Sequence, residues 1–300
     1  MSIRHFITLN SLSREELESI INRALELKEQ IKHKKYTTTL NNRVLGMIFE
    51  KSSTRTRVSF EAGMAQLGGH AIYIAPTGSQ IGRGEPLKDT ARVLSKMVDC
   101  IMVRTFEHEK LEEFTNYSDV PVINGLSDSF HPCQLLADLL TYTEARGSIE
   151  NKKVVWLGDG NNMCHSYMNA ARIFNFELVI SCPEDFVPAS EIYESSKENT
   201  SIEHDPFKAV ERADLVITDV WASMGQENEH KDRKEKFIKY QVNSEIMACA
   251  KSNALFMHCL PAHRDEEVTE EILEGQQSVV WEEAGNRLHS SKALLEFLLN

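Results

Sequence analysis

This chain contains the apolar run Val44-Leu45-Gly46-Met47-Ile48-Phe49 and, shortly after it, the polar run Ser53-Thr54-Arg55-Thr56-Arg57. The first run has the length and composition of a buried strand, and the apolar spacing then becomes that of a helix over residues 57–67. A helix that begins at a strand end offers unpaired backbone N–H groups and the positive end of its dipole. Three hydroxyls and two guanidinium groups there predict a pocket for a small, doubly charged anion such as phosphate. The alternative is an exposed polar turn with two surface arginines.

Strand patterns and helix patterns alternate along the whole chain. In the first half, strands are expected at 44–49, 71–74, 100–103 and 121–124, and helices at 57–67, 87–97, 107–116 and 131–146. After Gly147-Ser148, strands are expected near 153–157, 177–180, 215–218, 254–257 and 279–281, and helices near 164–174, 208–213, 232–239 and 243–251. This order predicts an α/β fold with two domains, 1–146 and 147–285, and a last helix at 286–300. Each domain is expected to be a parallel sheet with helices on both faces.

Three further motifs follow predicted strands, where open parallel sheets build their sites. They are His131-Pro132-Cys133-Gln134, Asp219-Val220-Trp221-Ala222-Ser223-Met224-Gly225 and His258-Cys259-Leu260-Pro261. Together with residues 53–57, and in this order, they resemble the aspartate/ornithine carbamoyltransferase family over nearly the whole chain. The second and third motifs resemble its ornithine branch.

Composition restricts the possible partners. The chain has 300 residues, of which 41% are hydrophobic, enough for two ordinary cores. Its net charge of -12 argues against a nucleic-acid partner, because phosphate backbones select basic surfaces. Residues 1–7 contain no long apolar run, and no stretch is long enough to span a membrane, so we expect neither a secretory signal nor a membrane partner.

The cysteines indicate the compartment. The 6 cysteines form no Cys-x-x-Cys pair and no zinc-type spacing; they lie at 100, 133, 164, 182, 249 and 259. Free thiols fit a reducing cytosol, so we expect a cytoplasmic protein without a metal site.

The resemblance implies an activity. It implies transfer of the carbamoyl group of carbamoyl phosphate to the δ-amino group of L-ornithine, giving L-citrulline and phosphate, without metal or cofactor. It also implies a homotrimer, or a multiple of trimers, in which a loop bearing Gln80 reaches the neighbouring subunit's site. The C-terminal helix is implied to return to the first domain, which binds carbamoyl phosphate, while residues 147–285 bind ornithine.

The resemblance also implies a set of carbamoyl phosphate contacts. They are Ser53, Thr54, Arg55, Thr56, Gln80, Arg104, His131, Gln134, Cys259, Leu260 and Arg287. An arginine such as Arg55 can pair two phosphate oxygens at once. Arg104 follows a predicted strand. The alternative to a phosphate contact is that Arg104 is an arginine of the protein surface. For Arg57, a salt bridge on the helix surface is at least as good an interpretation as a phosphate contact.

His131 and Gln134 lie one helical turn apart, and therefore on one face of the helix. Histidine can donate to the carbonyl oxygen as it becomes negative, although a helix-capping role is the alternative for His131 alone. Cys133 is interpreted as packing. The catalytic residues implied by the resemblance are Arg55, Arg104, His131 and Cys259.

The ornithine contacts implied by the resemblance are Asn162, Asp219, Ser223 and Met224. Cys259 and the Leu260 carbonyl are implied to orient the δ-amino group. A nucleophilic thiol at Cys259 is the alternative, but no catalytic triad is evident. Gly158-x-Gly160 suggests a dinucleotide site only weakly, because Met163 occupies the third glycine position.

Other functions remain open from the sequence. One is a related carbamoyltransferase for putrescine or an acylated ornithine, although Asp219 and residues 223–225 suit a substrate with amino-acid groups. Another is a nicotinamide-dependent dehydrogenase, which the missing third glycine disfavours. The last is an inactive binding subunit, which the presence of every expected type of site disfavours.

Overall fold

The computed structural model describes residues 3–75, 84–222 and 230–300, and they form two compact units. Unit 1 consists of Met1–Leu140 and Gly285–Asn300, and unit 2 of Thr141–Ala284. The division falls within two helices, α5 (Pro132–Arg146) and α12 (Val280–Leu299). The last sixteen residues therefore belong to the first unit, as expected of the C-terminal helix.

Unit 1 contains a parallel sheet with the strand order β2-β1-β3-β4. The strands are β1 (Val44–Phe49), β2 (His70–Ile74), β3 (Cys100–Arg104) and β4 (Val122–Leu126). The other helices of this unit are α1 (Arg14–Lys32), α2 (Thr54–Gln66), α3 (Leu87–Leu94) and α4 (His108–Tyr117). Parallel strands need crossover connections, which explains why helices separate them in the sequence.

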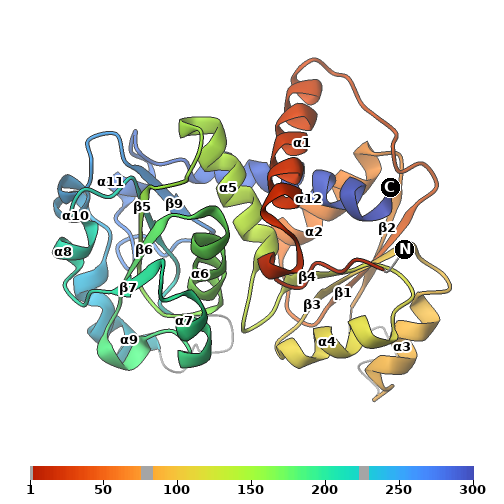
Figure 1. The fold of residues 1–300 in the computed structure, drawn as a ribbon, viewed down its shortest axis with the longest axis horizontal. Helices are drawn as coiled ribbons and strands as arrows, with labels where there is room; N and C mark the ends of the chain where they lie inside the picture. Colours follow the sequence, from red (N-terminus) through yellow and green to blue (C-terminus); the bar gives the residue numbers. More distant parts are fainter. Residues whose placement is uncertain (1–2, 76–83, 223–229) are drawn as a thin grey trace. The chain divides into compact units, whose positions relative to one another are not determined.

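Helices cover both faces of this sheet. Ile101 and Val103 of β3 pack in one cluster with Ala91 of α3 and Leu111 of α4, and Figure 1 shows these two helices on one side of the sheet. Successive side chains of a strand point to opposite faces, so Arg104 shares a face with Met102, away from α3 and α4. Burial explains the continuous apolar runs in β1 and β3, whereas the residues of β2, at the edge of the sheet, are exposed or half-buried.

Unit 2 contains a parallel sheet with the strand order β7-β6-β5-β8-β9. The strands are β5 (Lys153–Leu157), β6 (Glu177–Ser181), β7 (Thr200–Ile202), β8 (Leu215–Thr218) and β9 (Leu255–His258). The helices are α6 (Asn162–Phe174), α7 (Ser190–Ser196), α8 (Pro206–Val210), α9 (His230–Phe237), α10 (Ser244–Cys249) and α11 (Glu270–Leu273).

The second sheet is also covered on both faces. Val155 packs in one cluster with Val210 of α8 and Ile246 of α10. The neighbouring Trp156 places its ring 5.9 Å from that of Tyr167 on α6. Since adjacent strand residues point to opposite faces, α6 covers the face opposite α8 and α10.

The predicted fold class is confirmed, but one predicted element is wrong. Residues 279–281 were expected to form a strand, whereas α12 begins at Val280. Pairing with β9 is limited to a single bridge between Phe256 and Ser278. Three apolar residues are too few to distinguish a strand from a helix start, and Glu282 and Glu283 favour a helix N-terminus. Nowhere in the described parts of the chain does a helix combine the length and apolar character needed to cross a membrane.

Candidate active site

The polar run after β1 forms the N-terminus of α2. Ser53 is the N-cap residue, and its hydroxyl accepts a hydrogen bond from Thr56 N at 3.2 Å. Ser53 Oγ also donates to Thr56 Oγ1 at 3.0 Å. Thr56 is fully buried, Ser53 and Arg55 are half-buried, and Thr54 is exposed. The sequence therefore makes a capped helix start whose hydroxyls and guanidinium group lie at the positive end of the dipole.

Arg287 of α12 joins this helix start to α5. Its Nη2 donates to Thr56 Oγ1 at 3.0 Å, and its Nη1 donates to Gln134 Oε1. The amide nitrogen of Gln134 donates in turn to Asp138 Oδ1 at 2.8 Å. Asp138 is a residue that the sequence did not single out. Its spacing of one helical turn after Gln134 is the signal that could have found it.

His131 is buried beside several cations. Burial lowers the pKa of His131 well below its usual range, and the charges of Arg287, Arg104 and Arg55 lower it further. The imidazole is therefore neutral at physiological pH. A neutral imidazole carries one N–H donor, so it can donate a hydrogen bond to a carbonyl oxygen without adding a charge.

Two side chains close to this site have structural roles. Arg57 pairs with Glu61 at 2.8 Å, and its guanidinium carbon lies 4.0 Å from the centre of the Tyr73 ring. This pairing supports the interpretation of Arg57 as a residue of the helix surface. Cys133 donates its thiol to the carbonyl of Asn124 at 3.2 Å, and burial raises its pKa to about 12. A protonated, buried thiol fits the packing role expected for Cys133.

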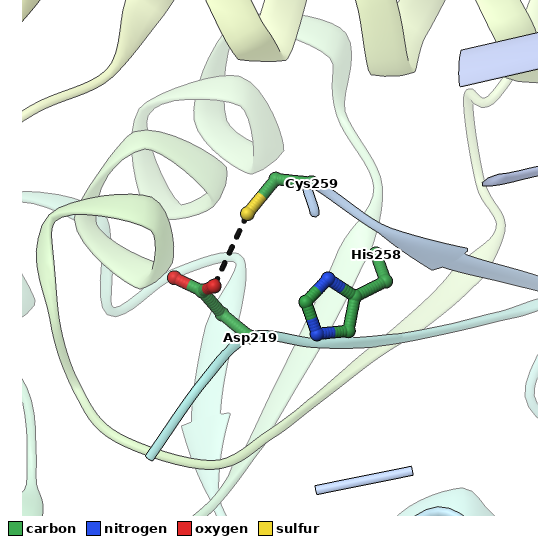
Figure 2. Close-up of side chains that lie close together, drawn as sticks. All are labelled: Asp219, His258 and Cys259. Carbon is green, nitrogen blue, oxygen red and sulfur yellow. Dashed lines mark hydrogen bonds between the residues drawn. The ribbon is translucent and has the colours of Figure 1, made fainter. Parts of the chain in front are cut away.

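In unit 2, Asp219 follows β8 and receives three donors. Its Oδ1 accepts from Val220 N at 2.8 Å and from Cys259 Sγ at 3.1 Å. Its Oδ2 accepts from Asn161 Nδ2 at 3.1 Å. Figure 2 shows the thiol of Cys259 directed at this carboxylate. Two of the residues predicted to contact ornithine or its amine, Asp219 and Cys259, are thus in direct contact.

His258 uses both of its ring nitrogens within the fold. Nδ1 accepts from Leu260 N at 2.9 Å, and Nε2 lies 3.1 Å from Glu267 Oε1. The first bond requires an unprotonated Nδ1, so the proton of the neutral ring is on Nε2 and points at Glu267. His258 therefore supports the backbone of Leu260, which has a positive φ of 57°. It offers Cys259 no base, in agreement with a thiol that does not act as a nucleophile.

Among the described residues, two groups of side chains bring together atoms of the types that bind metals. Ligand atoms of Asp219, His258 and Cys259 lie within 4.8 Å of one another. The unprotonated nitrogen of His258 is already an acceptor, so this group favours hydrogen bonding. The second group is His263, Glu266 and Glu267. Glu266 of this group already forms an ion pair with Lys234, whose Nζ lies 3.0 Å from Glu266 Oε1.

A buried ion pair of Arg233 and Asp159 connects the segments that follow β5 and β8 in the second sheet. Arg233 donates to Asp159 Oδ2 at 2.7 Å and to the carbonyl of Trp221 at 2.9 Å. Burial raises the pKa of Asp159, and the guanidinium group of Arg233 opposes that rise. The sequence did not reveal this pair, because 74 positions separate its two members.

Asn162 is the one remaining predicted ornithine contact that lies within the described residues. Asn162 is the first residue of α6, and its carbonyl accepts from Ser166 Oγ at 2.7 Å. Gln80, Ser223 and Met224 lie outside the described residues. Asn161, the neighbour of Asn162, was not among the predicted residues, although an asparagine just before a helix is a common capping signal.

Known proteins resemble this chain over its full length. Residues 4–144 match the aspartate/ornithine carbamoyltransferase carbamoyl-P binding domain, and residues 150–298 match the Asp/Orn binding domain of the same family. The ornithine carbamoyltransferase of Methylococcus capsulatus is 59% identical over 299 residues, which cover 100% of this chain and 99% of that protein. That of Hydrogenovibrio crunogenus is 57% identical over 299 residues, with the same coverage of 100% and 99%.

Solved structures agree with the sequence relatives. The crystal structure of ornithine carbamoyltransferase from Burkholderia thailandensis is 49% identical, with a TM-score of 0.93 and coverage of 99% of both chains. The Pyrococcus furiosus ornithine carbamoyltransferase is 46% identical, with a TM-score of 0.94 and coverage of 97% of this chain and 96% of the other.

Proposed function

This chain belongs to the aspartate/ornithine carbamoyltransferase family, and we propose that it transfers the carbamoyl group of carbamoyl phosphate to the δ-amino group of L-ornithine. The products are L-citrulline and phosphate. The observation that carries the choice of ornithine is the identity of 57–59%, over the full length, to relatives named for that substrate. The contacts of Asp219 agree with this choice, because a carboxylate ready to accept suits a substrate with an α-ammonium group.

In unit 1, we propose that the start of α2 binds the phosphate. Ser53, Thr54, Arg55 and Thr56 supply hydroxyls, backbone N–H groups and a guanidinium group, and Arg104 adds a second cation. His131, Gln134 and Arg287 then hold the carbamoyl group. The neutral His131 donates to the carbonyl oxygen, which becomes negative when the amine attacks. The cationic pocket stabilises the phosphate as it leaves.

In unit 2, we propose that Asp219 pairs with the α-ammonium group, while Asn162, Ser223 and Met224 bind the α-carboxylate. Cys259 and Leu260 orient the δ-amino group. An amine of this type has a pKa of roughly 10, and only its neutral form attacks. Activity should therefore rise as the pH is raised toward that value.

We propose further that the protein is cytoplasmic, acts in arginine biosynthesis and forms a homotrimer or a multiple of trimers. The family supports this assembly, in which Gln80 would reach the neighbouring subunit's site. The proposed domains are 1–146 with 286–300 for carbamoyl phosphate, and 147–285 for ornithine. The description of each matching family domain supports this assignment of substrates.

The test is citrulline formation by the purified protein with carbamoyl phosphate and a panel of amines. Ornithine should have the highest kcat/KM. Lysine, with one more methylene, would carry its amine past the carbonyl carbon, and putrescine lacks the groups that Asp219 and residues 223–225 would hold. Nα-acetylornithine removes the α-ammonium group alone and should react poorly.

The panel should be repeated with Asp219→Asn. Its matched control is Asp185→Asn, which removes an exposed acid paired with Lys236 in the same unit. Asp219→Asn should impair ornithine use far more than carbamoyl phosphate binding, because it removes a charged partner. A wild-type preference for putrescine or acetylornithine, or an unchanged kcat/KM for ornithine in Asp219→Asn, would reject the ornithine assignment.

A further inference from the structure

Asn161 contacts Asp219 and, at the same time, caps the helix that follows it. It is half-buried and lies between the Gly158–Gly160 turn and the first residue of α6. We propose that Asn161 is a positioning residue for ornithine: its amide holds the carboxylate of Asp219 in the orientation that receives the substrate's ammonium group. This inference rests on the proposed role of Asp219 as the ornithine-binding acid.

The amide of Asn161 has one possible orientation. Its Oδ1 accepts from Met163 N at 2.9 Å and from Cys164 N at 3.2 Å. Both partners are backbone N–H groups, which can only donate, so the oxygen must face the helix. The NH₂ group therefore has to face Asp219 Oδ2, at 3.1 Å. A flipped amide would lose both capping bonds and the bond to Asp219.

This bond completes the set of contacts around Asp219. The two contacts to Oδ1 come from the backbone of Val220 and the thiol of Cys259, and Asn161 supplies the contact to Oδ2. Donors from three separate segments thus define the plane of the Asp219 carboxylate, in a residue that is only 8% exposed. Without the Asn161 contact, rotation of the carboxylate about its Cβ–Cγ bond would be opposed by the two contacts to Oδ1 alone.

The two roles together select asparagine at position 161. Aspartate would keep the cap, because its oxygen also accepts from backbone N–H groups, but it would place two carboxylates against each other. Serine would keep a capping oxygen but has no NH₂ group to reach Asp219. The helix alone accepts any of the three, so the contact with Asp219 is what distinguishes them.

The structure offers a matched control for the capping role. Asn243 caps α10 in the same unit, and its Oδ1 accepts from Ile246 N at 3.0 Å. Asn243→Asp and Asn243→Ser therefore report what these two substitutions do to a cap away from Asp219. Each Asn161 variant should lose at least as much melting temperature as the corresponding Asn243 variant, and Asn161→Asp should lose more than Asn243→Asp, because it adds repulsion between two carboxylates to any change in the cap.

The deciding measurements are kcat, KM for ornithine and Kd for carbamoyl phosphate. Asn161→Asp should raise KM for ornithine on the order of tenfold or more, because Asp219 must then turn away or share a proton. Asn161→Ser should raise it less. The Kd for carbamoyl phosphate should stay at the wild-type value in both, and the Asn243 variants should keep wild-type kinetics.

A pH profile provides a readout that a capping role would not change. The ratio of variant to wild-type KM for Asn161→Asp should fall as the pH is lowered, since one carboxylate of the pair then takes up a proton. For Asn161→Ser the ratio should stay constant. If wild-type protein makes citrulline and Asn161→Asp keeps its KM for ornithine, the positioning role is overturned while the proposed function stands. If wild-type protein makes no citrulline from ornithine, both fall.

Discussion

Arg287 donates to Thr56 Oγ1 at 3.0 Å, although 231 positions separate the two residues in the chain. Thr56 is fully buried and Arg287 is 3% exposed. Through this bond the C-terminal helix contributes a guanidinium group to the start of α2. The proposed anion site therefore depends on two segments that are far apart in the chain, and its parts can be tested one residue at a time.

The first prediction concerns Arg55. Arg55→Lys should lower kcat on the order of a hundredfold or more, because an ammonium group cannot pair two phosphate oxygens as a guanidinium group does. The matched control is Arg57→Lys, two positions away on the same helix. Arg57 is already paired with Glu61 and is exposed, so this variant should keep wild-type kcat. Steady-state citrulline assays decide, and a wild-type kcat in Arg55→Lys would refute phosphate pairing.

The second prediction concerns His131 and acid pH. The pKa of His131 is lowered by burial and by nearby arginines, whereas in the unfolded chain it is about 6.5. Below that pH the unfolded state binds a proton that folded His131 does not, so the free energy of unfolding falls as pH falls. The slope from this group is at most about 1.4 kcal/mol per pH unit, and it vanishes above the unfolded pKa.

His131→Asn should therefore flatten the acid side of the stability profile, measured by urea unfolding across the acid to neutral range. His5 and His108 also have lowered pKa values from burial, so part of the slope should remain. His33→Gln, which replaces an exposed histidine on the surface, is the comparison variant. A slope in His131→Asn as steep as in the wild type would show that His131 titrates normally in the folded protein.

The third prediction concerns Cys259. Cys259→Ser keeps a donor toward Asp219 Oδ1 but shortens its reach, so the enzyme should stay measurably active with a higher KM for ornithine. Cys259→Ala removes the donor and should raise KM further. Intact-mass measurement of wild-type protein during turnover should show no adduct on the thiol. A trapped carbamoyl thioester would make Cys259 a nucleophile and contradict the orienting role.

The fourth prediction concerns the buried pair of Arg233 and Asp159. Arg233→Met should destabilise unit 2 by about 3–5 kcal/mol, because it leaves a buried carboxylate without its partner. Lys236 lies on the same helix as Arg233, and Lys236→Met, which breaks its exposed pair with Asp185, should cost less than about 1 kcal/mol. Chemical unfolding of both variants provides the comparison. Equal losses would indicate that burial of the first pair has no energetic consequence.

Much of the fold could be predicted because its signals are local. The change of apolar spacing after Phe49, the hydroxyl cap at Ser53 and the repeated order of strand and helix each depend on residues close together in the chain. Local signals failed where they were short. The run at 279–281 predicts a strand where α12 begins, and the sequence pattern does not predict the three-residue β7, because so few residues carry no distinct period.

The sequence by itself determined the two-unit α/β fold, the family and the motifs whose members are neighbours in the chain. Only the tertiary structure decided that Asn161 faces Asp219, that Arg233 neutralises Asp159, and that arginines from three segments surround a neutral His131. The physical reason is distance along the chain. Periodicity and capping act over a few residues, whereas burial, charge and hydrogen bonding act between groups that folding brings together from anywhere in the sequence.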